Sequence, residues 1–458
     1  MAGIGFVLRK LTKREDLTGI SLAYFHAIFA STGPWIITIA TIWAFFFVGN
    51  TWGLRGEIEV FRVVIFYNFS ASLVLTAAAV MVSTRYLADC IYRHDVTEGA
   101  GILIGTMGMQ LLVTTPLAFL AYAFFFELPP RLALLATLNF TLISGIWVAM
   151  VYVTTIKYFS IITGSFFFGM GAGLAAAYLL SGLIGPDGLL LGFNVGLAVI
   201  LASFVAITLV EYPPELSGMD AVLRNFKKYR LVALAGVLYN MGIWVDKWLM
   251  WSAPEARVIL GRLVSYPEYD SSMFLAYLIV IPAMAYFMLV EETSFFEEYI
   301  RYYKGIFQHD SLEKIEVNRE NIMQNIYQNG RNILVFQGAL CFFGVLLAPK
   351  ILEVMNMSLK QVAIFRFGLI GATFQTLALF LTILLTYFDE RRWVCLINGF
   401  FLLSNCLFTL ITLKLGFTYY GLGFCLSGIF TFLLAAVLLE RYVTRLSYHT
   451  FVTRNKFI

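Results

Sequence analysis

Residues 20–48 read ISLAYFHAIFASTGPWIITIATIWAFFFV, a run that contains no Asp, Glu, Lys or Arg. A helix rises about 1.5 Å per residue, so this run is long enough to cross a hydrocarbon core about 30 Å thick. It is too long for a cleaved signal peptide, lacks a small-residue cleavage site and is followed by more apolar sequence. We therefore expect the first transmembrane helix of the chain here.

Similar apolar runs recur to the end of the chain and predict twelve crossings of the membrane. The predicted spans are 20–48, 61–88, 100–126, 132–155, 158–181, 188–210, 231–251, 272–290, 330–348, 361–388, 393–413 and 418–439. Hydrophobic residues make up 60% of the 458 positions and charged residues only 13%, whereas soluble domains are about a quarter charged. The composition predicts an all-α polytopic membrane protein with no room for a separate soluble catalytic domain.

The basic residues orient the predicted spans. Most of the 32 Lys and Arg fall in alternate gaps, on the same side as both chain ends. Basic side chains resist translocation, so we expect both termini in the cytoplasm.

Segment 211–230 separates six spans from six and carries the pair Pro213–Pro214. The expected organisation is two six-helix lobes around a central cavity, an arrangement shared by several transporter superfamilies. The predicted parts are a cytoplasmic segment 1–19, an N-lobe 20–210, a cytoplasmic linker 211–230, a C-lobe 231–441 and a cytoplasmic tail 442–458.

Segment 291–329 is the longest predicted connection, and it places aromatic side chains at helical spacing. Its candidate partner-docking residues are Phe295, Phe296, Tyr299, Tyr303 and Phe307. One interpretation is an amphipathic helix that lies on the membrane surface. The other is a docking helix for a cytoplasmic protein, which the mixed charge of its polar face favours.

Several kinds of chemistry have no signature in the sequence. A GxxxxGK[ST] phosphate loop and an HExxH motif are both lacking, so we expect neither nucleotide hydrolysis nor a zinc site of that class. The four histidines and five cysteines show no metal-ligand spacing. The basic residues flank spans instead of forming one patch, so no nucleic acid is expected as a partner. We predict no enzyme, no cofactor and no metal.

The polar residues inside the predicted spans are mostly amides, and Asn68, Asn240, Gln337 and Gln375 are candidates to line a translocation path. Neutral amides suit a neutral, hydroxyl-rich solute, but they equally suit bonding between helices. Asp246 is the most informative acid, because it lies well inside the seventh span beside Lys247. The pair is either an interfacial pair that snorkels or satisfies itself, or a functional group at the outer mouth.

Arg62, Arg85 and Arg366 are the basic residues placed most nearly inside spans. They are expected either to anchor at headgroups or to contact an anion such as a sugar pyrophosphate. Proline at 34, 116 and 282 removes a backbone donor within a span, and Gly33–Pro34 is the strongest candidate for a helix break.

The opening MAGIGFVLRKL with STGPW at 31–35 resembles the PelG family of exopolysaccharide transport proteins. So do GIWVDKWLMW at 242–251, YPEYDSSMFLAYL at 266–278 and ETSFFEEYIRYY at 292–303. The resemblance covers essentially the whole chain and implies the fold of the multidrug, oligosaccharidyl-lipid and polysaccharide exporters. It also implies export of an N-acetylgalactosamine-rich polymer, with a cytoplasmic glycosyltransferase (PelF) and the membrane proteins PelD and PelE as partners.

Three functional hypotheses follow. The first is a translocator that passes a growing polysaccharide and draws its energy from polymer synthesis outside the chain. The second is a lipid-linked oligosaccharide flippase or an ion-coupled drug exporter of the same fold. The third is a scaffold that holds a synthase in the membrane.

Overall fold

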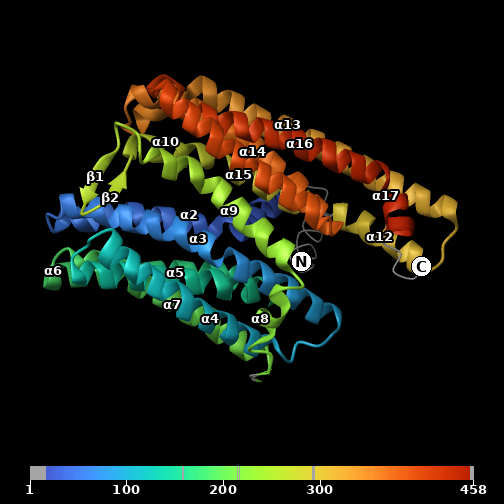
Figure 1. Cartoon of the computed structure of the whole chain (residues 1–458), viewed down its shortest axis with the longest axis horizontal. Helices are drawn as coiled ribbons and strands as arrows, with labels where there is room; N and C mark the ends of the chain where they lie inside the picture. The colour runs from blue at the N-terminus through green and yellow to red at the C-terminus, as the bar shows by residue number, and fades with distance from the viewer. Residues whose placement is uncertain (1–16, 157–158, 214, 216, 291–293, 454–458) are drawn as a thin grey trace. The chain divides into compact units, whose positions relative to one another are not determined.

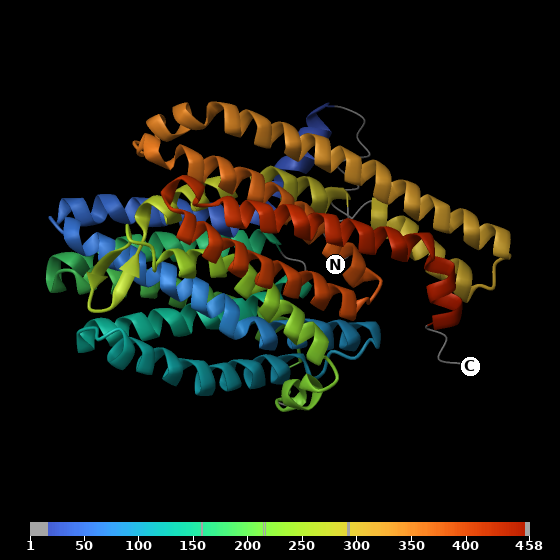
Figure 2. The same ribbon diagram turned by 45° about the horizontal axis from the view of Figure 1, so that its top comes forward.

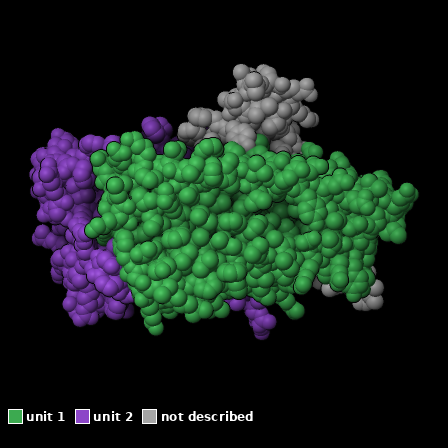
Figure 3. All heavy atoms as spheres, turned by 90° about the horizontal axis from the view of Figure 1, so that it is seen from above, with its two compact units in different colours: residues 1–31, 245–250, 267–458 green, residues 32–244, 251–266 purple. Residues whose placement is uncertain are grey.

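The structure is a computed structural model, and it describes residues 17–156, 159–213, 215, 217–290 and 294–453. Its contacts divide the chain into two compact units, which are coloured in Figure 3. Unit 1 comprises 1–31, 245–250 and 267–458, and unit 2 comprises 32–244 and 251–266. The lobe boundaries predicted from the sequence remain a prediction.

Each predicted span falls on one or more helices of the structure (Figure 1). The first half of the chain contains α2 (Leu17–Thr51), α3 (Arg55–Tyr92), α4 (Gly99–Leu120), η1 (Ala121–Phe125), α5 (Pro130–Ile156), α6 (Phe159–Ile184), α7 (Asp187–Glu211), α8 (Ala221–Phe226) and α9 (Arg230–Met250). The strands β1 (Arg257–Leu260) and β2 (Leu263–Ser265) follow. The second half contains α10 (Pro267–Tyr277), α11 (Val280–Val290), α12 (Phe296–Phe307), α13 (Leu312–Val354), η3 (Leu359–Gln361), α14 (Val362–Tyr387), α15 (Arg391–Leu415), η4 (Phe417–Tyr419), α16 (Leu422–Thr444), α17 (Leu446–Tyr448) and η5 (His449–Thr453).

Within the described residues, eleven helical segments are long and apolar enough to cross a membrane. The remaining predicted span is α9, whose hydropathy is lowered by Asn240, Asp246 and Lys247. The predicted all-α polytopic membrane fold is therefore confirmed.

The three in-span prolines act differently. The helix α2 continues through Gly33–Pro34, and Thr38 Oγ1 donates to Pro34 O at 2.8 Å, so the helix is not interrupted there and a kink at this pair remains a prediction. Pro116 likewise lies inside α4. The break falls at Leu278–Ile279, between α10 and α11, because Pro282 has no N–H for the carbonyl of Leu278.

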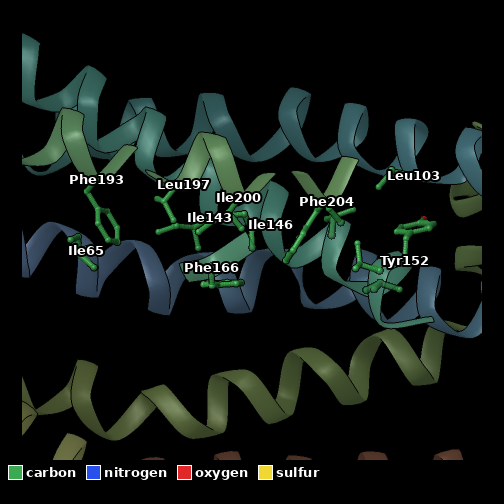
Figure 4. Close-up of a cluster of buried hydrophobic side chains, with 14 of the residues drawn as sticks. Ile65, Leu103, Ile143, Ile146, Tyr152, Phe166, Phe193, Leu197, Ile200 and Phe204 are labelled. Atoms are coloured by element: carbon green, nitrogen blue, oxygen red, sulfur yellow. The ribbon is translucent and has the colours of Figure 1, made fainter. Parts of the chain in front are cut away.

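Unit 2 is built around α5, which packs beside α3, α4 and α7, while α6 runs along α7. Figure 4 shows the buried side chains that α3, α4, α5, α6 and α7 contribute to the core of this unit. Lipid is as apolar as these side chains, so close packing rather than hydrophobic burial must hold the helices together. Glycine supplies that closeness: a Cβ on Gly192 of α7 would lie 2.3 Å from Ala177 Cα of α6.

Unit 2 also contains a β-hairpin, which we did not predict from the sequence. Its strands β1 and β2 pair antiparallel, and Gly261 makes the turn with a φ of +56°. A side chain there would also collide with Phe126 O, at 2.3 Å from the Cβ position. Tyr67 OH donates to Val264 O at 2.7 Å, and the Tyr67 ring stacks on Trp251 at 4.2 Å between centroids. Burial of these aromatic faces fixes the hairpin to α3.

Unit 1 is organised around α14, which packs against α10, α13 and α16, while α15 packs against α16. At the far end of the unit, the first turns of α13 lie beside α17 (Figure 2). Ser447 Oγ donates to Glu316 Oε1 at 2.7 Å, and Arg319 donates to Thr444 O at 3.3 Å. The polar first half of α13 is thus tied to the C-terminal part of the chain.

Candidate functional site: a buried ion pair in unit 1

Asp246 and Lys247 occupy the last turns of α9, and both are buried, with exposed fractions of 0% and 4%. Lys247 Nζ donates to both carboxylate oxygens of Asp246, at 3.1 Å each. The ammonium therefore turns inward and does not snorkel. Removing one partner of such a pair leaves an uncompensated buried charge, which costs about 3–5 kcal/mol.

Two aromatic rings cover the ammonium. Lys247 Nζ lies 5.1 Å from the centroid of Tyr277 and 5.4 Å from that of Phe424. A cation over a ring face is attracted by the ring quadrupole, and the attraction is strongest where water is excluded. The two rings come from α10 and α16, so the ammonium is held between helices far apart in the sequence.

Hydrogen bonds hold the carboxylate from two further directions. Tyr269 OH of α10 donates to Asp246 Oδ2 at 2.9 Å, and Asn405 Nδ2 of α15 donates to Oδ1 at 3.4 Å. Thr409 Oγ1 donates to the Asn405 Oδ1 at 3.2 Å and orients the amide. The carboxylate thus receives neutral donors as well as the ammonium, and its charge is satisfied inside the unit.

Local sequence explains why these helices meet. Pro267 starts α10, where its missing N–H and fixed φ are tolerated, and Tyr269 follows within the first turn. A Cβ on Gly423 would lie 2.6 Å from Thr409 N, so only glycine lets α16 approach α15 here. That approach brings Phe424 and Asn405 to the same ion pair.

Gln361 fastens the start of α10 to the start of α14. Its Nε2 donates to Glu268 O at 2.8 Å and to Ser271 Oγ at 3.1 Å. Its Oε1 accepts from Ser358 N at 2.9 Å, within a capping box that begins η3. The helix that carries Tyr269 and Tyr277 is therefore fixed at its first turn.

A second buried polar network lies in unit 2. Tyr122 OH donates to Asn68 Oδ1 at 2.6 Å, Asn68 Nδ2 to Asn139 Oδ1 at 2.8 Å, and Asn139 Nδ2 to Asn194 Oδ1 at 2.7 Å. The last hydrogen bond of this network runs from Asn194 Nδ2 to Leu135 O, at 3.0 Å. Four elements, η1, α3, α5 and α7, are joined by these bonds. Asn68, a candidate for the path, is therefore occupied in bonding between helices.

The other candidate path residues are Asn240, Gln337 and Gln375. Asn240 Nδ2 donates to Gly236 O at 2.9 Å, within α9. Gln337 donates to Thr373 Oγ1 at 3.3 Å across α13 and α14, and Gln375 is buried on α14. None of these contacts tests whether the three line a path.

Two of the three candidate arginines lie on one helix of unit 2, and the third lies in unit 1. Arg62 is exposed on α3, and Arg85 lies on the same helix with its Nε 3.5 Å from Asp89 Oδ1. At about 1.5 Å per residue, Arg62 and Arg85 are roughly 35 Å apart along α3. Arg366 belongs to unit 1, and its Nε donates to Val345 O at 3.1 Å. Arg62 and Arg85 therefore cannot bind one pyrophosphate together.

The predicted aromatic helix is present as α12, and several of its candidate docking residues, called the aromatic stripe below, pack on the same chain. Phe295, directly before α12, is buried against Tyr387 and Phe388, with ring centroids 5.4 and 6.3 Å away. Tyr299 OH donates to Tyr387 O at 3.1 Å. Phe296 and Tyr303 are half-buried, whereas Phe307 is 77% exposed. The stripe thus anchors α12 to the end of α14, and partner docking by these residues remains a prediction.

The sequence reading singled out Asp246 and Lys247 but missed Tyr269, Tyr277 and Phe424. Tyr269 and Tyr277 lie in the motif YPEYDSSMFLAYL, and that motif was the available signal. Across the described residues, no group of three or more His, Cys, Asp or Glu could hold a metal ion.

Comparison with known proteins identifies the family and the fold of the chain. A family model described as "PelG: Putative exopolysaccharide Exporter (EPS-E)" matches residues 1–451. No curated protein matches the chain.

Solved structures of transporters share the fold. A MOP superfamily transporter from Pyrococcus furiosus superposes with a TM-score of 0.61 at 12% identity, over 92% of this chain and 96% of that one. An Asp-to-Asn variant of the Vibrio cholerae MATE transporter VcmN gives 0.60 at 11% identity, over 97% and 98%. An outward-facing MATE transporter gives 0.58 at 12%, over 92% and 96%. The likeness confirms the predicted twelve-helix, two-lobed transporter fold.

Proposed function

Because this chain belongs to the PelG family of exopolysaccharide exporters, we propose that it passes a growing, uncharged exopolysaccharide across the bacterial inner membrane. The observation that carries the proposal is the family match over residues 1–451 on a transporter fold. In this proposal the polymer is rich in N-acetylgalactosamine, both chain ends lie in the cytoplasm, and the chain is not an enzyme.

The energy for transport comes from outside the chain. The sequence has no phosphate loop for nucleotide hydrolysis. Asp246, the acid that an ion-coupled exporter would use, is already paired with Lys247. Polymer elongation by a cytoplasmic glycosyltransferase such as PelF supplies the displacement, and PelD and PelE hold that enzyme at the membrane.

Deletion of the gene tests the proposal. Secreted polymer should be lost and either accumulate inside the cell or stop being made, while an immunoblot shows that the glycosyltransferase is still present. Complementation with the wild-type chain should restore secretion. Normal secretion from the deletion strain would contradict the proposal.

The flippase and the ion-coupled exporter are separated from this function by reconstitution. Proteoliposomes with an imposed sodium or proton gradient should show no gradient-driven drug movement, and no movement of lipid-linked oligosaccharide. The distance of roughly 35 Å between Arg62 and Arg85 along α3 already argues against a shared pyrophosphate site. Gradient-driven drug export would instead support the ion-coupled alternative.

A further inference from the structure

We propose that Asp246, Tyr269 and the ring faces of Tyr277 and Phe424 form a monovalent-cation site whose resident cation is the ammonium of Lys247. The inference rests on the proposed transport function and explains why that function needs no ion gradient at this site. The chain carries the cation as a side chain, so the site cannot exchange it with the solution.

The donor set is that of a cation site. Both oxygens of the Asp246 carboxylate face one positive centre at 3.1 Å. Tyr269 OH donates to the carboxylate at 2.9 Å and holds it in place beside that centre. Hard monovalent and divalent metal ions prefer such oxygen ligands. The faces of Tyr277 and Phe424, at 5.1 and 5.4 Å from Lys247 Nζ, attract a cation through the ring quadrupole.

The position of the ammonium excludes simple anchoring. A lysine near the end of a membrane helix ordinarily extends its charge toward headgroups or water. Lys247 is 4% exposed and folds back onto the residue before it. Elements from four separate parts of unit 1 surround the pair: α9, α10, α15 and α16. Burial of an ion pair costs free energy, and the hydrogen bonds of Tyr269 and Asn405 to the carboxylate and the two rings over the ammonium offset that cost.

Removing the ammonium should open the site to an external ion. In Lys247→Gln the Asp246 carboxylate stays buried with Tyr269 and Asn405 beside it. Rotation of the Asn405 amide would present its oxygen in place of its nitrogen. A small metal cation could then enter and restore neutrality, which the uncharged glutamine cannot do.

The experiment compares sodium with choline at equal ionic strength on the purified full-length chain. Thermal unfolding of the wild type should be the same in both salts. Lys247→Gln should melt about 2–4 °C higher in sodium chloride, with a saturable dependence on sodium. The double variant Asp246→Asn with Lys247→Gln should lose that difference.

Lys350→Gln is the matched control, because Lys350 also pairs with a nearby carboxylate but lies exposed. It should show no sodium-specific shift. If Lys247→Gln unfolds on extraction, extraction in sodium should recover more folded protein than extraction in choline, as judged by size-exclusion chromatography.

Two results would overturn the inference. One is a sodium-specific stabilisation of the wild type that Asp246→Asn abolishes, because the site would then already bind an external ion. The other is the absence of any sodium effect in Lys247→Gln, by melting or by recovery. Polymer secretion is not measured in these experiments, so their failure leaves the proposed export untouched, and a failure of export leaves the salt response intact.

Discussion

At the scale of single residues, the membrane penalises a polar group without a partner, and Asn68, Asn139 and Asn194 show how the chain avoids that penalty. Each amide both donates and accepts within the network. From the sequence alone, such amides could equally bond helices or contact a neutral solute. The meeting of α3, α5 and α7 gives these amides their partners, which the sequence could not identify because they are 55 to 71 residues apart.

We predict that Asn139→Ala destabilises the chain more than Tyr122→Phe does. Asn139 makes two side-chain bonds in the network, whereas the Tyr122 hydroxyl makes one. Each interhelical bond is worth about 0.6–2 kcal/mol in a membrane protein. Thermal unfolding in detergent measures the difference, and Tyr92→Phe, at a residue 82% exposed, is the control. If both variants lost the same amount of thermal stability, the number of hydrogen bonds removed from the network would not determine its contribution.

The ion pair shows the same limit of prediction. The sequence identified Asp246 and Lys247 because charged residues inside a span are rare. It could not show that Asn405, 159 positions later, touches the carboxylate. The approach of α16 to α15 depends on Gly423, and a glycine in an apolar run gives no sign of what it faces.

At the scale of elements, the helices were predictable and their breaks were not. Hydrophobic runs fixed each span, because length and apolarity alone decide what can cross the membrane. Pro34 stays inside α2, whereas the chain breaks ahead of Pro282, because the surrounding packing decides whether a missing N–H is tolerated. The short hairpin of β1 and β2 escaped prediction because its strands are too brief to show an alternating pattern.

Arg366 offers a test at a proline in α13. Pro349 has no N–H to donate to Val345 O four residues earlier, and Arg366 Nε donates to that oxygen instead, at 3.1 Å. Arg366→Ala should cost about 1–3 kcal/mol, because a carbonyl oxygen loses a charged donor. In a Pro349→Ala background the helix supplies its own N–H, so the same arginine substitution should cost much less. A double-mutant cycle of thermal unfolding measures this coupling. Additive effects would disprove the link.

The contact between α6 and α7 gives a second test at this scale. Gly192→Ala should lower the melting temperature, because its Cβ would lie 2.3 Å from Ala177 Cα. Gly171→Ala on α6 is the matched control, since a Cβ there meets nothing within 4 Å. Alanine is also the better helix former by about 1 kcal/mol, so the control should be neutral or slightly stabilising. A neutral Gly192→Ala would show that the two helices can separate without cost.

At the scale of the whole molecule, the orientation that we predict from the distribution of Lys and Arg is open to a direct test. Val258 in β1 and Leu312 at the start of α13 are exposed to similar extents, 67% and 69%. A membrane-impermeant maleimide should label Val258→Cys in intact spheroplasts but Leu312→Cys only after the membrane is opened. The wild type, whose five cysteines are buried or half-buried, measures the background. Labelling of Leu312→Cys but not of Val258→Cys in intact spheroplasts would contradict the predicted topology.

The length of α13 has a mechanical consequence. Its 43 residues span about 65 Å, roughly twice the hydrocarbon core. Pro349 lies near one end of the helix, and Leu312 is about 55 Å away at the other. The first turns of the helix are held there by Ser447, which donates to Glu316, and by the carbonyl of Thr444, which accepts from Arg319. A tilt of α13 would therefore carry the C-terminal helix α17 with it, or break both hydrogen bonds.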